Sequence, residues 1–385
     1  MRAVIVTGGE FTVEDVPAPD PGTGQLVLNV SRTGICGSDL HARYHADQVS
    51  DLMATAGQDG FMRSDERIVM GHEFVGTVAS YGPGCRKRWP VGTRVVAMPI
   101  LKTDAGAQLT GFSTQAPGGY AEQVVVQEAV TMPVPDSLSD EQAALTEPMA
   151  VAWHAVRRAA VGRRTAIVIG CGPIGLAVIT MLRASGVKRI VASDLSPRRR
   201  ELARECGAHA VVDPRVDSPW DAYSAKNEIR GYSELVALGI STMEKLRIVD
   251  RLPWPRVFRL AERIGATPSG PVVFECVGVP GMIDSVIAAA PLMSRVAVVG
   301  VCMETDHFTP AVAIGKEIDL RFMFGYDPGE FHDTLHMIAS GRVDVRPLIT
   351  GTVGLGGVDA AFAALGDPEK HAKILIAPSS TATAP

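Results

Sequence analysis

Short apolar segments separated by turns make up the N-terminal part of the chain. Their β-branched residues, and the proline and glycine clusters between them, are typical of strands joined by tight turns. The predicted strands are Gln25–Val30, Phe74–Val78, Arg94–Ala97 and Ala121–Val126. This pattern predicts a compact β-rich domain with irregular loops.

From about Thr165 the pattern changes to short apolar strands that alternate with helices. The predicted strands here are Ala166–Ile169, Arg189–Ala192, Ala210–Val212, Val272–Cys276 and Arg295–Val299, and the predicted helices are Pro173–Ala184, Pro197–Cys206 and Met282–Ala290. Such alternation is typical of a doubly wound parallel sheet, so the middle of the chain is predicted to be an α/β domain. A helix over Pro328–Ser340 and a strand over Ala372–Ile376 are predicted after it.

Two stretches lie outside these patterns. Ser50–Arg67 is polar and admits two interpretations: an ordinary surface loop, or a wall of a substrate cleft made apolar by Tyr44, Phe61 and Met62. Asp213–Gly270 is too long for a loop between a strand and a helix, and its apolar residues recur at helical spacing. We therefore predict added helices there, as an oligomer contact or a cover on the active-site cleft.

Composition restricts the class of protein. A chain of 385 residues corresponds to two or three domains, and 46% hydrophobic with 21% charged residues excludes disorder as its main character. A net charge of −5 argues against a nucleic-acid or anionic-membrane partner. The six cysteines are scattered rather than spaced as a disulfide framework, and no secretion signal is recognisable, so a cytoplasmic protein is expected.

The uncharged run Thr165–Leu182 is at the lower end of the length of a membrane-spanning helix. Gly170, Gly172 and Pro173 would break such a helix in its middle. A buried strand, a glycine turn and a buried helix therefore explain the run better than a membrane span.

The glycine motif in this run predicts a dinucleotide site. Gly170, Gly172 and Gly175 form a G-x-G-x-x-G pattern that follows a strand, and Pro173 and Ile174 open the next helix. Glycines allow a tight turn close to a pyrophosphate, and the helix N-terminus offers free N–H groups to that anion. The alternative is a glycine turn that packs a helix on a sheet and binds nothing.

Asp194, at the end of the following strand, predicts which dinucleotide is bound. Its carboxylate can accept hydrogen bonds from both ribose hydroxyls and would repel a 2′-phosphate, which favours NAD. Arg198, Arg199 and Arg200 follow and are able to hold the 2′-phosphate of NADP, although arginines in a helix that starts at Pro197 are usually solvated. We expect NAD, with Arg199 among the residues that contact the cofactor.

Three further motifs carry residues with metal-binding side chains. They are Gly34–His41, which contains Cys36, Ser38 and His41; Gly71–Gly76, which contains His72 and Glu73; and Glu147–Ala152. Each has an ordinary interpretation on its own: a small core cysteine, a hydrogen-bonded histidine, or a carboxylate at a helix start.

Together with the glycine motif and the segment Pro117–Glu122, these motifs resemble the zinc-dependent medium-chain alcohol dehydrogenase family, in particular its polyol and threonine dehydrogenase branch. The resemblance extends from Ala3 to about Ile376. It implies a GroES-like irregular β-barrel catalytic domain at 1–152 and 313–385, and a Rossmann domain at 153–312 with a helical insertion at about 213–270. The cleft between the two domains is expected to hold zinc and the nicotinamide.

The resemblance also implies roles for individual residues. Cys36, His72 and Glu147 match zinc ligands, and Glu73 matches an exchangeable ligand or a residue that supports the ligands. Ser38 and His41 match a relay that carries the substrate proton to solvent; the alternative for His41 is a hydrogen bond to a cofactor phosphate.

Many members of this family hold a second, structural zinc on four cysteines. Pro99–Ala116 contains no cysteine and Cys85 stands alone, whereas a closed zinc site requires four ligands. One catalytic zinc per subunit and no structural zinc are therefore expected.

The leading prediction is an NAD-dependent zinc enzyme that oxidises a secondary alcohol or polyol, and the resemblance implies a homodimer or homotetramer. Two alternatives stay open: a zinc-free quinone or enoyl reductase on the same scaffold, and a non-catalytic dinucleotide-binding protein. The sequence does not identify the alcohol.

Overall fold

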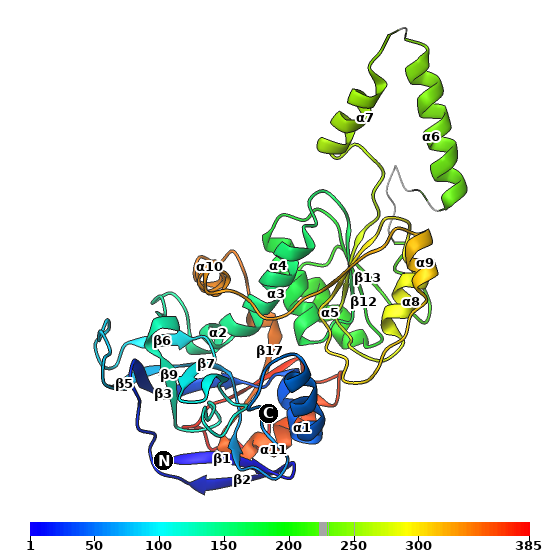
Figure 1. Cartoon of the computed structure of the whole chain (residues 1–385). Helices are drawn as coiled ribbons and strands as arrows, with labels where there is room; N and C mark the ends of the chain where they lie inside the picture. The colour runs from blue at the N-terminus through cyan, green and yellow to red at the C-terminus, as the bar shows by residue number, and fades with distance from the viewer. Residues whose placement is uncertain (223–228, 230, 250) are drawn as a thin grey trace. The chain divides into compact units, whose positions relative to one another are not determined.

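The computed structural model of the chain describes residues 1–222, 229, 231–249 and 251–385. It divides into two compact units (Figure 1). Unit 1 comprises Met1–His154, Gly172–Ala184 and Gly325–Pro385, and unit 2 comprises Ala155–Cys171 and Ser185–Phe324.

Unit 1 is built on a mixed sheet in the order β10-β6-β5-β3-β18-β17, with β9 also paired to β3; β17 and β18 are parallel and the other pairs are antiparallel. A second sheet has the order β2-β1-β4, and β7 and β8 form a hairpin. The strands of unit 1 are β1 (Arg2–Thr7), β2 (Glu10–Asp15), β3 (Gln25–Gly34), β4 (Ile68–Val69), β5 (Glu73–Tyr81), β6 (Arg94–Ala97), β7 (Ile100–Thr103), β8 (Gly106–Leu109), β9 (Gln123–Gln127), β10 (Thr131–Pro133), β17 (Ile349–Val353) and β18 (Lys373–Ile376).

The C-terminal strand β18 completes the N-terminal domain. It pairs antiparallel with β3, placing Leu375 opposite Gly34 and Ile376 opposite Thr33. The return of the chain to the first domain was predicted, and the pairing puts Lys373 of β18 next to the residues that follow β3.

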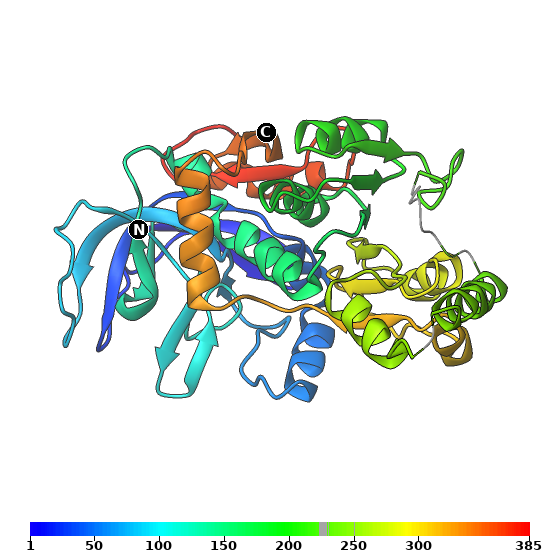
Figure 2. The ribbon, with the colours of Figure 1, turned by 90° about the horizontal axis from the view of Figure 1, so that it is seen from above.

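The chain segments of unit 1 also carry helices, and one of these, α3, continues into unit 2. Figure 2 shows α10 from the side, in orange. The helices are α1 (Gly37–Thr55), α2 (Asp140–Ala144), α3 (Thr146–Ala159), α4 (Pro173–Ala184), α10 (Pro328–Ala339) and α11 (Val358–Leu365), with short 3-10 turns η1 (Glu128–Val130), η2 (Arg346–Leu348) and η3 (Leu355–Gly357).

The structure separates the three apolar residues that were expected to line a wall at Ser50–Arg67. Its first residues belong to α1, and Met62 is only 3% exposed within the core that also contains Phe112 and Tyr120. Tyr44, by contrast, is 60% exposed. Tyr44 and Met62 therefore do not share a surface, whereas Phe61 stacks on Phe112, whose ring also contacts that of His72.

Unit 2 contains a parallel sheet in the order β13-β12-β11-β14-β15-β16. Numbered along the chain this is 3-2-1-4-5-6, the strand order of a Rossmann domain, so the predicted fold class is confirmed. Its elements are β11 (Ala166–Ile169), β12 (Ile190–Ser193), α5 (Pro197–Glu205), β13 (Ala210–Val212), α6 (Tyr232–Arg247), α7 (Trp254–Arg263), β14 (Val272–Glu275), α8 (Met282–Ala289), β15 (Arg295–Val298), α9 (Pro310–Gly315) and β16 (Asp319–Phe322).

The sheet extends beyond the predicted domain boundary at 312. The edge strand β16 pairs with β15 in parallel, and unit 2 ends at Phe324. This strand was not predicted because Asp319 and Arg321 make it look like a loop; in the fold, Asp319 pairs with Arg295 at 2.6 Å and with Arg321 at 3.0 Å.

The predicted helices between Asp213 and Gly270 are present as α6 and α7 (Figure 1). Every residue of these two helices is described, and none of them is buried. Their apolar side chains therefore contribute little to the core of unit 2.

Among the described residues, no helix is both long and apolar enough to cross a bilayer. The uncharged run Thr165–Leu182 is divided between β11 and α4, as predicted.

Candidate metal centre and dinucleotide site

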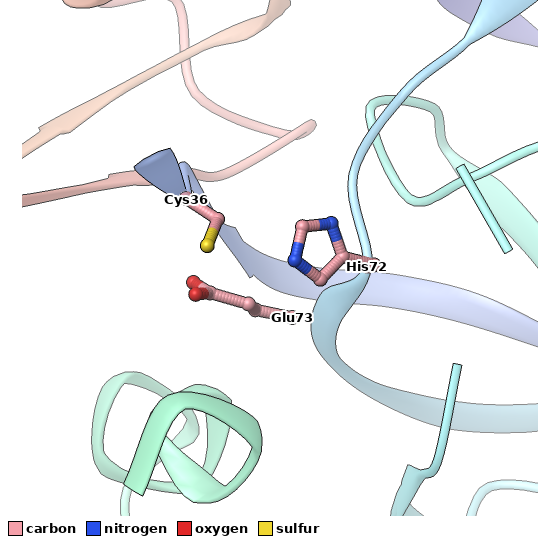
Figure 3. A group of neighbouring side chains, drawn as sticks. All are labelled: Cys36, His72 and Glu73. Atoms are coloured by element: carbon pink, nitrogen blue, oxygen red, sulfur yellow. The ribbon is translucent and has the colours of Figure 1, made fainter. Parts of the chain in front are cut away.

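Three side chains with metal-ligating atoms come together in unit 1 (Figure 3). They are Cys36, His72 and Glu73, and one donor atom of each lies within 4.8 Å of the other two. Cys36 is the residue before α1, and Glu73 is the first residue of β5. The structure thus unites three of the four residues for which the sequence predicted a zinc-binding role.

The pairing of β3 with β5 creates this group. Gly34, the last residue of β3, lies opposite Glu73, so Cys36 two residues later reaches the start of β5. A side chain at Gly34 would collide with the Glu73 carboxylate. Gly71 has a φ of +98°, and a side chain there would collide with the ring of Tyr120. Glycine at both positions allows the close approach of the two segments.

Asp39 orients His72 within the group. Its Oδ1 lies 3.2 Å from His72 Nδ1, and its Oδ2 accepts hydrogen bonds from the Tyr120 hydroxyl at 2.7 Å and the Cys36 amide at 2.9 Å. Burial alone would raise the pKa of Asp39, but His72 and these hydrogen bonds hold it below its usual value. A carboxylate behind one ring nitrogen leaves the other free for a metal. Nε2 of His72 faces the Ser38 hydroxyl at 3.5 Å.

Lys373 supplies a buried positive charge beside Glu73. Its Nζ lies 2.6 Å from Glu73 Oε1 and 2.9 Å from the carbonyl oxygen of Ile35, to which it donates. Burial would lower the pKa of Lys373, but the charges of Glu73 and Cys36 raise it above its usual value. Sequence reasoning missed both Lys373 and Asp39. The only available signals were a lysine inside a buried strand and a carboxylate three residues after Cys36.

Glu147 lies beside the group without joining its three close donor atoms. It is a buried first-turn residue of α3, and its carboxylate is hydrogen-bonded to the Tyr326 hydroxyl. The pKa of Glu147 is raised to about 7, chiefly by burial; the charge of Glu73 acts in the same direction, while His72, Tyr326 and Lys373 oppose the rise. Tyr326 is a further residue that the sequence did not reveal.

The chemistry of these residues fits a zinc ion. Thiolate and imidazole donors favour zinc over magnesium or calcium, and donors around one zinc ion lie about 3.3–3.8 Å apart. The carboxylates of Asp39, Glu73 and Glu147 are all buried near Cys36, with Lys373 as the positive side chain among them. Without a metal, protons balance the charges of this group, because Asp39 holds the pKa of His72 well above its usual value despite burial and the pKa of Glu147 is raised to about 7. A divalent cation would displace such protons from the side chains that bind it.

Ser38 and His41 occupy the first turns of α1, next to the group. Burial lowers the pKa of His41, and the neighbouring His45 lowers it further. A half-buried histidine one turn after Ser38 is compatible with the predicted proton relay, which stays a prediction.

The glycine motif forms a tight turn at the end of β11. Gly170 has a φ of +88°, and its amide donates to the Ser193 carbonyl oxygen at 2.8 Å. A side chain at Gly170 would lie 2.7 Å from Val277 Cγ2. Only glycine is compatible with this conformation and this close approach. The helix α4 follows at Pro173, in the strand–turn–helix order that the motif requires.

The Asp194 side chain is hydrogen-bonded to this turn. Its Oδ2 accepts a hydrogen bond from the Cys171 amide at 2.6 Å, and its Oδ1 accepts one from the Ser196 amide at 2.8 Å. Among the arginines that follow, Arg198 pairs with Glu201 at 3.1 Å and Arg200 with Asp213 at 3.2 Å. The acid therefore stands at the turn, and two of the three arginines are engaged with carboxylates.

Comparisons with known proteins identify the family of this chain. The family described as "Alcohol dehydrogenase GroES-like domain" matches residues 22–136, and the one described as "Zinc-binding dehydrogenase" matches residues 173–250. The (R,R)-butanediol dehydrogenase of Bacillus subtilis (strain 168) is 30% identical over 380 residues, which cover 96% of this chain and 97% of that protein. The chain belongs to the zinc-dependent medium-chain alcohol dehydrogenase family.

Other relatives in this family act on polyols and related alcohols, according to their names. The sorbitol dehydrogenase of Gallus gallus is 27% identical over 91% of this chain and 88% of that protein. The L-threonine 3-dehydrogenase of Rhizobium johnstonii is 26% identical over 95% of each. The predicted branch of the medium-chain alcohol dehydrogenases is confirmed.

A solved structure of this family supports the fold. The crystal structure of 2R,3R-butanediol dehydrogenase from Bacillus subtilis matches with a TM-score of 0.73 and 29% identity, over 98% of this chain and 99% of that one. The predicted combination of a GroES-like domain with a Rossmann domain is therefore confirmed by the comparisons as well as by the sheet order.

Proposed function

We propose that this medium-chain dehydrogenase is an NAD-dependent, zinc-requiring enzyme that oxidises a secondary alcohol or polyol. The observation that carries the proposal is the buried group of Cys36, His72 and Glu73, with Asp39 behind the histidine. A nucleotide-binding fold alone does not require these side chains. They count against both a zinc-free reductase and a non-catalytic protein.

Cys36 and His72 would hold the zinc ion, with Glu147 or Glu73 as the third ligand. Zinc at such a site polarises the substrate hydroxyl and lowers its pKa. The ion pair of Glu73 with Lys373 and the hydrogen bond of Glu147 with Tyr326 are the contacts that each carboxylate would loosen to bind the metal. We infer one zinc per subunit, since Pro99–Ala116 lacks the cysteines of a structural site.

Ser38 and His41 would move the proton that the alcohol loses. The Ser38 hydroxyl faces His72 Nε2 at 3.5 Å, next to a side chain that would hold the metal. Ser38 can accept the substrate's O–H proton while passing its own to His41, which exchanges it with solvent. The carbon-bound hydrogen leaves with its electron pair to the oxidised nicotinamide, so the products are a ketone or aldehyde, a reduced cofactor and one proton.

We propose NAD as the cofactor. The Asp194 carboxylate stands at the glycine turn, where it would bind ribose hydroxyls and repel a 2′-phosphate. The engagement of Arg198 and Arg200 with Glu201 and Asp213 leaves Arg199 as the arginine for the ribose or pyrophosphate.

The names of the relatives suggest the substrate class. Butanediol, sorbitol and threonine each carry a secondary hydroxyl next to a second polar group. We therefore propose a small vicinal diol or polyol. The division of Tyr44 and Met62 between solvent and core removes the reason for expecting a bulky apolar alcohol.

A substrate panel with metal removal tests the proposal. NAD reduction is followed by absorbance with butanediol, sorbitol, threonine and bulky cyclic alcohols. A strong chelator should abolish the activity, zinc should restore it, and NADH binding should survive. Activity that survives chelation and the His72→Ala substitution would favour the zinc-free reductase. NADH binding without turnover of any alcohol at saturating zinc would favour a non-catalytic protein.

We propose that the enzyme is a cytoplasmic homodimer or homotetramer. Each of the six cysteines is free in the described structure, as in a protein of a reducing compartment. Exposed apolar side chains on α6 and α7, among them Ile240 and Leu260, supply a surface for a second copy.

A further inference from the structure

The helix α10 carries two histidines one turn apart, outside the sites described above. His332 and His336 are both exposed, and their Nε2 atoms form a hydrogen bond of 3.0 Å, which a metal ion bound to both nitrogens would replace. The ring centroids are 4.2 Å apart, with the ring planes at 72°. Residues four apart on a helix share a face, so both rings project from the same side of α10.

The spacing of the two nitrogens matches that of two ligands on one metal ion. Imidazole nitrogen binds zinc at about 2.0–2.1 Å, so two such ligands at right-angle to tetrahedral geometry lie about 2.9–3.4 Å apart. We propose that His332 and His336 form a second, solvent-facing site for a divalent transition-metal ion, independent of the Cys36 group.

The surroundings hold this site in place. The first turn of α10 is fixed by a reciprocal cap, in which Asp327 accepts from the Glu330 amide at 2.8 Å and Glu330 accepts from the Asp327 amide at 3.0 Å. The Glu330 carboxylate also lies 2.8 Å from His154 Nδ1. Because the helix is anchored by these contacts, binding a metal requires the ordering of only two side chains.

The local charge favours a cation. Asp333 Oδ1 lies 3.7 Å from His332 Nδ1, and a carboxylate on this side of the ring stabilises a histidine whose other nitrogen binds a metal. The side chains of His332 and Asp333 are both 55% exposed, so water completes the coordination sphere.

The donor set decides which ions are bound. A pair of imidazoles without a thiolate has its highest affinity for copper. Its affinities for nickel and zinc are lower than for copper but higher than for magnesium or calcium. Such a site is weaker than a buried centre with three protein ligands, and it fills when the free metal concentration rises. If metal analysis finds more than one zinc ion per chain, the additional zinc would be bound at α10 and not at a four-cysteine site.

Titration of the zinc-loaded enzyme tests the proposal. Protein carrying its catalytic zinc is titrated with Cu²⁺ and with Ni²⁺ in separate calorimetric experiments, and one additional equivalent is expected. The substitutions His332→Ala and His336→Ala should each remove that equivalent. His307→Ala is the control, because His307 is exposed on unit 2 and should leave the titration unchanged.

Spectroscopy provides a second readout. The electron paramagnetic resonance spectrum of the added Cu²⁺ should show coupling to two imidazole nitrogens, and to one at most in either variant. Ni²⁺ should also protect His332 and His336 from acylation of their rings. No additional equivalent in the wild type, or an equivalent that both variants retain, would overturn the proposal.

Discussion

Lys373 and Glu73 form a buried ion pair across 300 positions of the chain, with Nζ 2.6 Å from Oε1. The side chains are 2% and 0% exposed. The last strand of the fold thus delivers the counter-charge of a carboxylate at the metal centre. In the absence of a metal, the lysine is what makes burial of Glu73 tolerable.

Substitution of Lys373 by methionine should destabilise the metal-free enzyme by about 3–5 kcal/mol, because it leaves the Glu73 charge buried and unpaired. Urea unfolding of the chelated protein measures this. Zinc should recover part of the loss, since it provides Glu73 with a new partner. The double variant Lys373→Met/Glu73→Gln should regain most of the stability.

The matched control is Lys370→Met, whose side chain is 71% exposed and pairs with Asp367 at the surface. It should change stability by less than about 1 kcal/mol. If the double variant is as unstable as Lys373→Met alone, the lysine contributes through packing rather than through its charge.

The Asp39 carboxylate should increase the zinc affinity of the site through its contact with His72. Replacing it with asparagine removes the charge behind His72 Nδ1, and the zinc affinity should fall by roughly 10–100-fold. Competition with a chromophoric chelator measures the change. Asp104→Asn, in the exposed turn between β7 and β8, should leave the affinity unaltered. Equal zinc affinities of Asp39→Asn and the wild type would mean that His72 is oriented without this carboxylate.

Asp194 should determine the choice between NAD and NADP. The Asp194→Asn variant keeps an oxygen that can accept from the Cys171 amide but loses the charge that repels a 2′-phosphate. The ratio of kcat/KM for NADP to that for NAD should rise roughly tenfold, or about 1.4 kcal/mol. A wild-type enzyme that already prefers NADP, or an unchanged ratio in the variant, would contradict the role given to this carboxylate.

Much of the fold could be predicted where apolar runs have clear ends. Arg94–Ala97 and Ala166–Ile169 were predicted with their observed bounds, because glycine or charged turn residues flank each run. The edge strand β16 was missed since Asp319 and Arg321 interrupt its apolar pattern, and their pairing with Arg295 depends on a neighbouring strand. Local pattern identifies apolar strands, the edge strand β13 (Ala210–Val212) included, but not a strand whose apolar positions alternate with paired charges.

Local sequence pattern also identifies only some of the residues of the candidate site. Cys36, His72 and Glu73 stand in recognisable motifs, whereas no motif surrounds Lys373 or Tyr326 in the sequence. Lys373 arrives through the pairing of β18 with β3, and Tyr326 through the hydrogen bond to Glu147. Long-range pairing of this kind is fixed by the fold as a whole.

The exposed helices α6 and α7 carry apolar side chains that are suited to a contact between subunits. Trp254, Phe258 and Leu260 of α7 are 41%, 37% and 58% exposed, and Arg256 and Arg259 lie between them in sequence. A helix with one apolar and one basic face, neither of them buried, gains stability when the apolar face meets a partner. We therefore expect this face to lie at a contact between subunits.

The triple variant Trp254→Ser/Phe258→Ser/Leu260→Ser should have a smaller assembly mass by light scattering, with the unfolding free energy of the separated subunit changed by less than about 0.5 kcal/mol. The control is Val216→Ser, because Val216 is 78% exposed in the same unit but lies outside the two helices. The substitution Ile314→Ser tests α9 as an alternative contact surface, because Ile314 is 79% exposed on that helix. Dissociation by the Ile314 variant, with the triple variant still assembled, would assign the contact to α9 and leave α6 and α7 free for another role.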